Sequence, residues 1–147
     1  MHWKLLNDDR QRTYLLVFET GDEPMQMLAQ FAMERNIGAA SFTAIGAFSD
    51  AVLGYFDWER KDYLKNNIGE QVEVLSLVGD VALADGKPKA HAHVVLGRRD
   101  AAAIGGHLLE ARVRPTLEVV LVESPAHLVR RHDAESGLAL IALDRRA

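Results

Sequence analysis

Most of this chain follows the period-two pattern of strands, and one stretch follows the spacing of a helix. Runs of β-branched, aromatic and aliphatic residues that end at Gly, Asp, Asn or Pro predict strands. These runs are 13–19, 39–45, 47–57, 71–84, 90–96, 108–122 and 138–143, with a short exposed strand or turn at 58–67. Helical spacing spans about 24–35, where Asp22 can cap the first turn and Pro24 can lie within it. The pattern predicts an α/β protein of the α+β type, with about seven mostly antiparallel strands and one main helix packed on the sheet.

Glycine and proline divide these runs. Asp85-Gly86 predicts a tight turn that pairs 81–84 with 90–96 as a hairpin. Gly79, beside Asp80, predicts a break or bulge, and the pair Gly105-Gly106 predicts a sharp turn. Gly46 suggests a bend in the same way, and Pro115 requires an edge, a strand start or a kink.

Three of the six histidines lie close together in the sequence, at His91, His93 and His107. Residues i and i+2 of a strand point to the same face, so His91 and His93 should stand side by side. His107, entering from the glycine turn, would complete a three-nitrogen metal site with an open coordination position. The alternative is a polar, solvent-facing alternation with no ligand.

Two acids occupy otherwise apolar strands. Glu118 could accept a hydrogen bond from a ligand histidine, or it could simply be exposed. The same two alternatives, a partner for a ligand histidine or plain exposure, apply to Asp80. The arginine doublets, among them Arg130-Arg131, are typical of solvated faces.

Composition narrows the function classes. A chain of 147 residues with 48% apolar residues is long enough for one domain with a substantial core, over 1–147. The net charge of -4 weighs against a strongly basic nucleic-acid binder. With no cysteine, a transition-metal site must use His, Asp or Glu. No long apolar run indicates a signal peptide or a membrane span, so a cytoplasmic protein is expected.

Four stretches of the chain resemble the PPC domain (plants and prokaryotes conserved, also called domain of unknown function 296). They are GDEPMQMLAQFA (21–32), ASFTAIGAFSDAVLGYFD (40–57), EVLSLVGDVALADGKPKAHAHVVLGR (73–98) and GGHLLEARVRPTLEVVL (105–121). The resemblance implies a largely antiparallel α/β protomer, assembly as a homotrimer, and a divalent metal ion, with zinc expected, at His91, His93 and His107. Plant members add AT-hooks with an Arg-Gly-Arg-Pro core, which this chain lacks.

Two functional hypotheses follow. The first is an oligomerising, metal-binding PPC module that takes part in DNA-associated regulation, with DNA or DNA-binding proteins as partners. The second is a metal-dependent, hydrolase-like enzyme whose open coordination position activates water near neutral pH. The strands 74–83 and 117–122 have apolar residues on both faces, and one helix covers only one face of the sheet. We therefore expect a second protomer to cover the other face, with the histidines near the subunit boundary.

Overall fold

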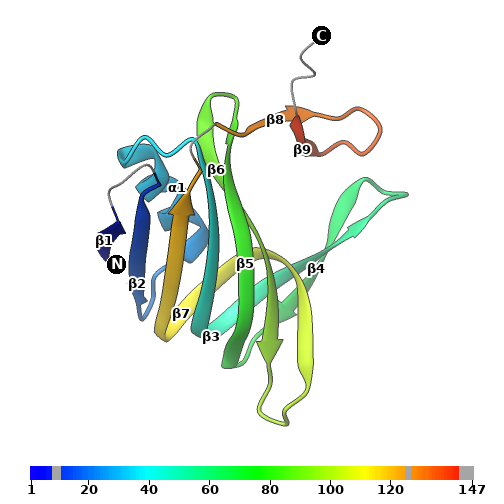
Figure 1. Cartoon of the computed structure of the whole chain (residues 1–147). Helices are drawn as coiled ribbons and strands as arrows, with labels where there is room; N and C mark the ends of the chain where they lie inside the picture. The colour runs from blue at the N-terminus through cyan, green and yellow to red at the C-terminus, as the bar shows by residue number, and fades with distance from the viewer. Residues whose placement is uncertain (8–10, 125–126, 143–147) are drawn as a thin grey trace.

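The structure is a computed structural model, and it describes residues 1–7, 11–124 and 127–142. These residues form one helix and nine strands in a single sheet (Figure 1). The elements are β1 (His2–Asn7), β2 (Thr13–Glu19), α1 (Pro24–Glu34), β3 (Ala39–Asp57), β4 (Asp62–Ile68), β5 (Val72–Ala84), β6 (Lys87–Gly97), β7 (Ala103–Glu123), β8 (Val129–His132) and β9 (Ala139–Ala142). The sheet runs β1-β2-β7-β3-β5-β8-β9, with β4 paired to β3 and β6 paired to both β5 and β7.

The mainly antiparallel sheet with one helix confirms the predicted class. The parallel pair β5–β8 makes the sheet mixed. Two short strands, β1 and β8, were not predicted, and the last residue of the predicted strand 138–143 lies outside the described residues. In the described part of the chain, α1 is far too short to span a membrane, and no helix there is long and apolar enough to do so.

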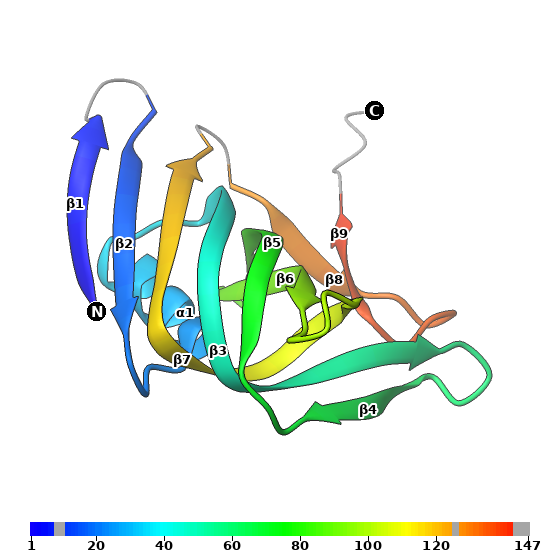
Figure 2. The ribbon, with the colours of Figure 1, turned by 90° about the horizontal axis from the view of Figure 1, so that it is seen from below.

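The two longest strands, β3 and β7, pair with each other and bend together (Figures 1 and 2). Their register shifts near Gly46, which has a φ of 151°. These shifts confirm the bend predicted at Gly46. A Cβ atom there would lie 2.3 Å from the Thr116 carbonyl oxygen, so only glycine permits this close approach of the two strands. The strands β3, β5, β6 and β7 pair in a closed cycle, which brings β6 beside the first residues of β7.

The helix α1 packs against β6 and β7 and buries Leu28, Phe31 and Ala32. The predicted cap was wrong by one residue. Glu23 is the N-cap, and its carboxylate accepts a 2.7 Å hydrogen bond from the Gln26 backbone N–H. Asp22 instead accepts a hydrogen bond from the backbone N–H of Glu19 and lies 3.1 Å from the N-terminal amine.

The regular alternation of buried and exposed residues along β5 breaks after Leu75, because the β5–β6 pairing carries a bulge between Val74 and Ser76. Leu77 is therefore buried with Val74, while Leu75 is 55% exposed. Gly79 is not a bulge. Its pairing with both neighbouring strands is regular, and a Cβ atom there would lie 2.3 Å from the ring of Phe42. Close packing therefore explains this glycine.

Candidate metal centre

Pairing between β6 and β7 brings the three predicted histidines together. His91 and His93 share one face of β6, with the buried residue Ala92 between them on the opposite face. His93 is the direct cross-strand partner of His107 on β7. Side chains of directly paired residues stand on the same face of a sheet, so the three imidazoles meet above it.

The three rings form one compact cluster. Ring centroids lie 5.3 Å apart for His91 and His93, 4.9 Å for His91 and His107, and 5.3 Å for His93 and His107. One ligand nitrogen from each ring lies within 4.8 Å of the other two. Among the described residues, this is the one group of three or more His or acidic side chains close enough to hold a metal ion.

His107 reaches the cluster from within a strand. The predicted turn at Gly105-Gly106 was wrong, since both glycines lie inside β7 and pair with Val95 and Val94. A Cβ atom on Gly105 would approach the Val94 carbonyl oxygen to 2.9 Å, and one on Gly106 would approach the Gly54 carbonyl oxygen to 3.0 Å. These glycines therefore permit close strand packing beneath the site.

Burial keeps two of the imidazoles neutral. It lowers the pKa of His107 to about 4, helped by the positive charge of neighbouring groups, His91 first among them. Burial and His91 also lower the pKa of His93. Neutral imidazoles present free nitrogen lone pairs at physiological pH, which is the state that binds a metal ion.

The residues present fit a divalent metal ion. Nδ1 of His107 is buried and has no hydrogen-bond partner. A buried polar nitrogen without a partner costs about 1–3 kcal/mol, and a metal ion would satisfy it. Zinc–nitrogen bonds are about 2.0–2.1 Å long, so the three nitrogens would approach one another by rotation of their side chains to surround one ion.

A carboxylate stands behind His91. Asp80 is the cross-strand partner of His91, and its Oδ2 lies 3.6 Å from Nδ1 of that ring. Burial alone would raise the pKa of Asp80, but its contacts with His91 and Arg130 hold the pKa below the usual value. An ionised carboxylate in this place orients a ligand imidazole and increases its basicity.

The structure does not bring Glu118 to the histidines. Glu118 lies farther along β7, beyond the bend, and lines a separate depression with Leu15 and Thr43. Glu118 is exposed, which was one of the two alternatives for it, and it is not the partner of a histidine in the cluster. The carboxylate beside His91 is instead Asp80, its cross-strand partner.

Two residues that had no predicted role at the site, Tyr63 and Arg130, also contact the histidine cluster. Tyr63 of β4 stacks on His107, with ring centroids 4.7 Å apart and an interplanar angle of 29°. The side chain of Arg130 on β8 is only 9% exposed. Its Nη2 donates a 2.6 Å hydrogen bond to Asp80 Oδ1 and lies 3.3 Å from His91 Nδ1. Neither residue carries a local sequence signal for this position, since both reach the site through long-range pairing.

Comparison with known proteins gives a consistent picture. The Plants and Prokaryotes Conserved domain family matches residues 7–125. A plant- and prokaryote-conserved protein of Pyrococcus horikoshii is 32% identical, with a TM-score of 0.84 over 97% of this chain and 95% of the other. A metal-containing protein of Archaeoglobus fulgidus is 36% identical, with a TM-score of 0.82 over 97% of each chain. A candidate DNA-binding protein of Ralstonia eutropha is 34% identical, with a TM-score of 0.83 over 88% of this chain and 90% of the other. No curated protein matches.

Proposed function

This chain belongs to the Plants and Prokaryotes Conserved domain family, and we propose that it is a single-domain, metal-binding homotrimer that serves DNA-associated regulation through its partners. The proposal of a metal ion rests on one observation: three imidazoles from β6 and β7 offer nitrogens within 4.8 Å of one another. The metal-containing relative from Archaeoglobus fulgidus supports it. Zinc is the ion we propose, because it accepts three imidazoles and retains an open position. Elemental analysis of the purified chain tests this directly.

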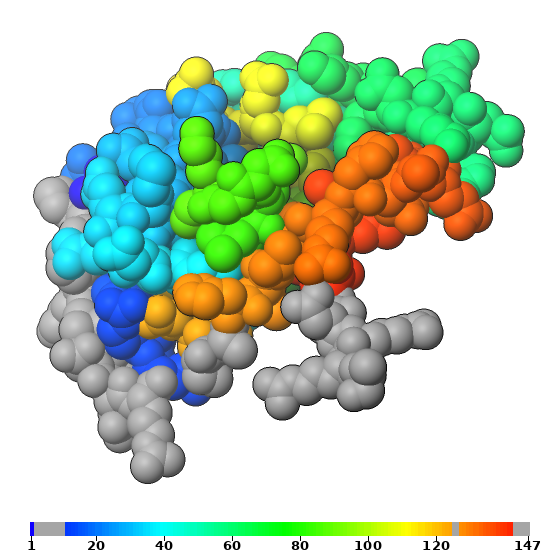
Figure 3. Space-filling model, turned by 90° about the horizontal axis from the view of Figure 1, so that it is seen from above, coloured from blue at the N-terminus to red at the C-terminus, as the bar shows by residue number. Residues whose placement is uncertain are grey.

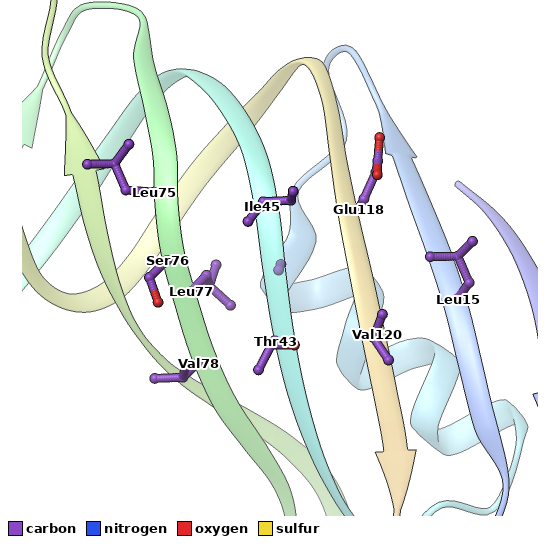
Figure 4. A pocket seen from close by; sticks show the side chains of 10 residues that line it. Leu15, Thr43, Ile45, Leu75, Ser76, Leu77, Val78, Glu118 and Val120 are labelled. Atoms are coloured by element: carbon purple, nitrogen blue, oxygen red, sulfur yellow. The ribbon is translucent and has the colours of Figure 1, made fainter.

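The outer face of the sheet supports the trimer. On the face away from α1, Ile45, Leu75, Val78 and Val120 are 61%, 55%, 51% and 39% exposed. They line a depression of about 370 Å³ across β3, β5 and β7 (Figure 4). Contiguous apolar surface of this kind marks an interaction site. A closed threefold ring, in which each protomer presents this face to the next, would cover it.

The histidines lie beside this face. Val78 lines the depression and is the direct cross-strand partner of His93, so the two side chains stand next to each other on one face. This adjacency supports the proposal that the metal centre lies near the subunit boundary.

The support for contact with DNA is the name of the relative from Ralstonia eutropha, a candidate DNA-binding protein. The chain carries a net charge of -4 and has no AT-hook. We therefore expect the isolated chain to bind duplex DNA weakly and without sequence preference, with partners supplying the contact.

A fluorescence-anisotropy titration with AT-rich and GC-rich duplexes, at several salt concentrations, measures this. Weak binding, equal for the two duplexes and falling steeply as salt rises, is the expected result. Tight, AT-selective binding at physiological salt would show that the chain reads DNA by itself.

A second candidate function is metal-dependent catalysis of a hydrolase type. The observation that favours it is a cavity of about 180 Å³ next to His91 and His107. A metal ion held by three imidazoles supplies an open coordination position in which water or a substrate oxygen can be activated. Asp80 would hold His91 in the orientation that this chemistry needs.

A further inference from the structure

The C-terminal hairpin encloses one side of the histidine cluster. The strands β8 and β9 pair with each other, and β8 joins β5 at Leu83 and Ala84. Figure 3 shows this hairpin, in orange and red, lying beside the end of β3 and β4. Its residues 138–140 and Arg130 line the same cavity as His91 and His107. The hairpin follows the residues that the family match covers, which end at 125.

The cavity is electropositive at one end. Lys89 and Arg130 line it, and no acidic side chain is among the described residues of its wall. Asp80 accepts one hydrogen bond from Arg130, and its negative charge balances that of the guanidinium. The charge of Lys89 is then not balanced within the wall, so the cavity has a net positive charge even without a metal ion. A divalent ion on the histidines would add to that surplus.

Two hydrogen bonds hold the guanidinium of Arg130 in place and leave some of its N–H donors unused. Nη2 donates to Asp80, and Nη1 donates a 3.2 Å hydrogen bond to the Ala139 carbonyl oxygen. The buried Nε has no partner, although the side chain is only 9% exposed. A guanidinium has five donors in a fixed fork, and an unsatisfied buried donor is rare, so an oxyanion acceptor is the natural complement.

The rest of the wall is apolar. Leu138, Ala139 and Leu140 line the cavity together with Ala90 and Tyr63. At about 180 Å³ the space suits a molecule of a few heavy atoms. It would take a charged oxygen group at the arginine end and a short apolar part along the hairpin.

We infer that this cavity binds a small oxyanion, a short carboxylate or a phosphate ester, held by Arg130 and Lys89 with one oxygen directed toward the histidine centre. The inference rests on the proposed metal centre only for that last contact. The ligand class, a small oxyanion, goes beyond what the family's description says.

The test uses the full chain, metal-free and loaded with cobalt(II), titrated with acetate, propionate, inorganic phosphate and neutral acetamide. Calorimetry follows binding in both forms, and the cobalt absorption band reports entry of the anion at the metal. We expect propionate or phosphate to bind and acetamide not to bind. Preference between the two anions identifies the carboxylate or the phosphate class.

Arg130→Gln should weaken anion binding roughly tenfold to hundredfold, because a charge-assisted hydrogen bond in a desolvated site is lost. Arg130→Lys should recover part of that loss. Arg131→Gln is the matched control, since the next residue of β8 is exposed and is not among the residues that line the cavity. Circular dichroism checks folding, and Lys89→Gln, at an exposed position, provides a second variant that should weaken binding in the same direction.

Failure of the wild type to bind either propionate or phosphate more tightly than acetamide, or unchanged anion affinity in Arg130→Gln, would overturn the inference. If the Arg130 variants do not fold, unchanged affinity in Lys89→Gln overturns it. A wild-type chain that takes up no metal would contradict the proposed metal function alone, because the titration of the metal-free chain still decides the anion site.

Discussion

Replacing His91 and His93 together by alanine is expected to abolish stoichiometric metal binding. The double variant leaves one imidazole, His107, where a stable site needs three protein ligands. Metal content should fall from about one ion per chain to less than about a tenth of that value. The measurement is elemental analysis of the variant and the wild type, purified side by side without chelators.

His132→Ala is the matched control, because His132 is an exposed residue of β8 outside the cluster, and its removal should leave metal content unchanged. Circular dichroism should show a folded double variant, since His91 and His93 do not belong to the buried core. A folded double variant that still carries one ion per chain would exclude these histidines as the ligands.

The second large effect concerns assembly. We expect the wild type to have a mass in light scattering of about three times the 16.3 kDa of one chain. Ile45→Lys should convert the trimer to a monomer. Burying an isoleucine side chain stabilises an interface by about 1.5–3 kcal/mol. Burying an unpaired lysine at the same place would destabilise the interface instead. A threefold ring would contain the substitution three times.

Met33→Lys is the control for this experiment. Met33 is 57% exposed, close to the 61% of Ile45, but it lies on α1 and outside the apolar depression. The Met33 variant should remain a trimer. A wild type that is monomeric at micromolar concentration would refute the assembly. An Ile45→Lys variant that remains a trimer would move the interface to another face.

Much of the site could be predicted from the hairpin alone. The turn at Asp85-Gly86 pairs Ala84 with Lys87, and that register continues without interruption to the pair Asp80 and His91. Both turn residues have positive φ, 51° and 74°, as a tight hairpin turn requires. Following this register from the turn identifies Asp80, rather than Glu118, as the carboxylate beside the histidines.

Other features depend on contacts that no local pattern reveals. Gly105 and Gly106 were interpreted as a turn, because glycine is common there, yet their function is close strand packing. The bulge between Val74 and Ser76 turns Ser76 outward and Leu77 into the core, against regular alternation, and leaves no local signature. Arg130 belongs to a basic doublet that is typical of a solvated face, and only the pairing of β8 with β5 buries it beside Asp80.

The central claim is that His91, His93 and His107 hold one metal ion, and X-ray absorption at the metal edge of the purified chain tests it most directly. We predict about one zinc ion per chain with three imidazole nitrogens at about 2.0–2.1 Å. A chain that remains metal-free after expression with added zinc, or an ion surrounded by oxygen alone, would contradict the account.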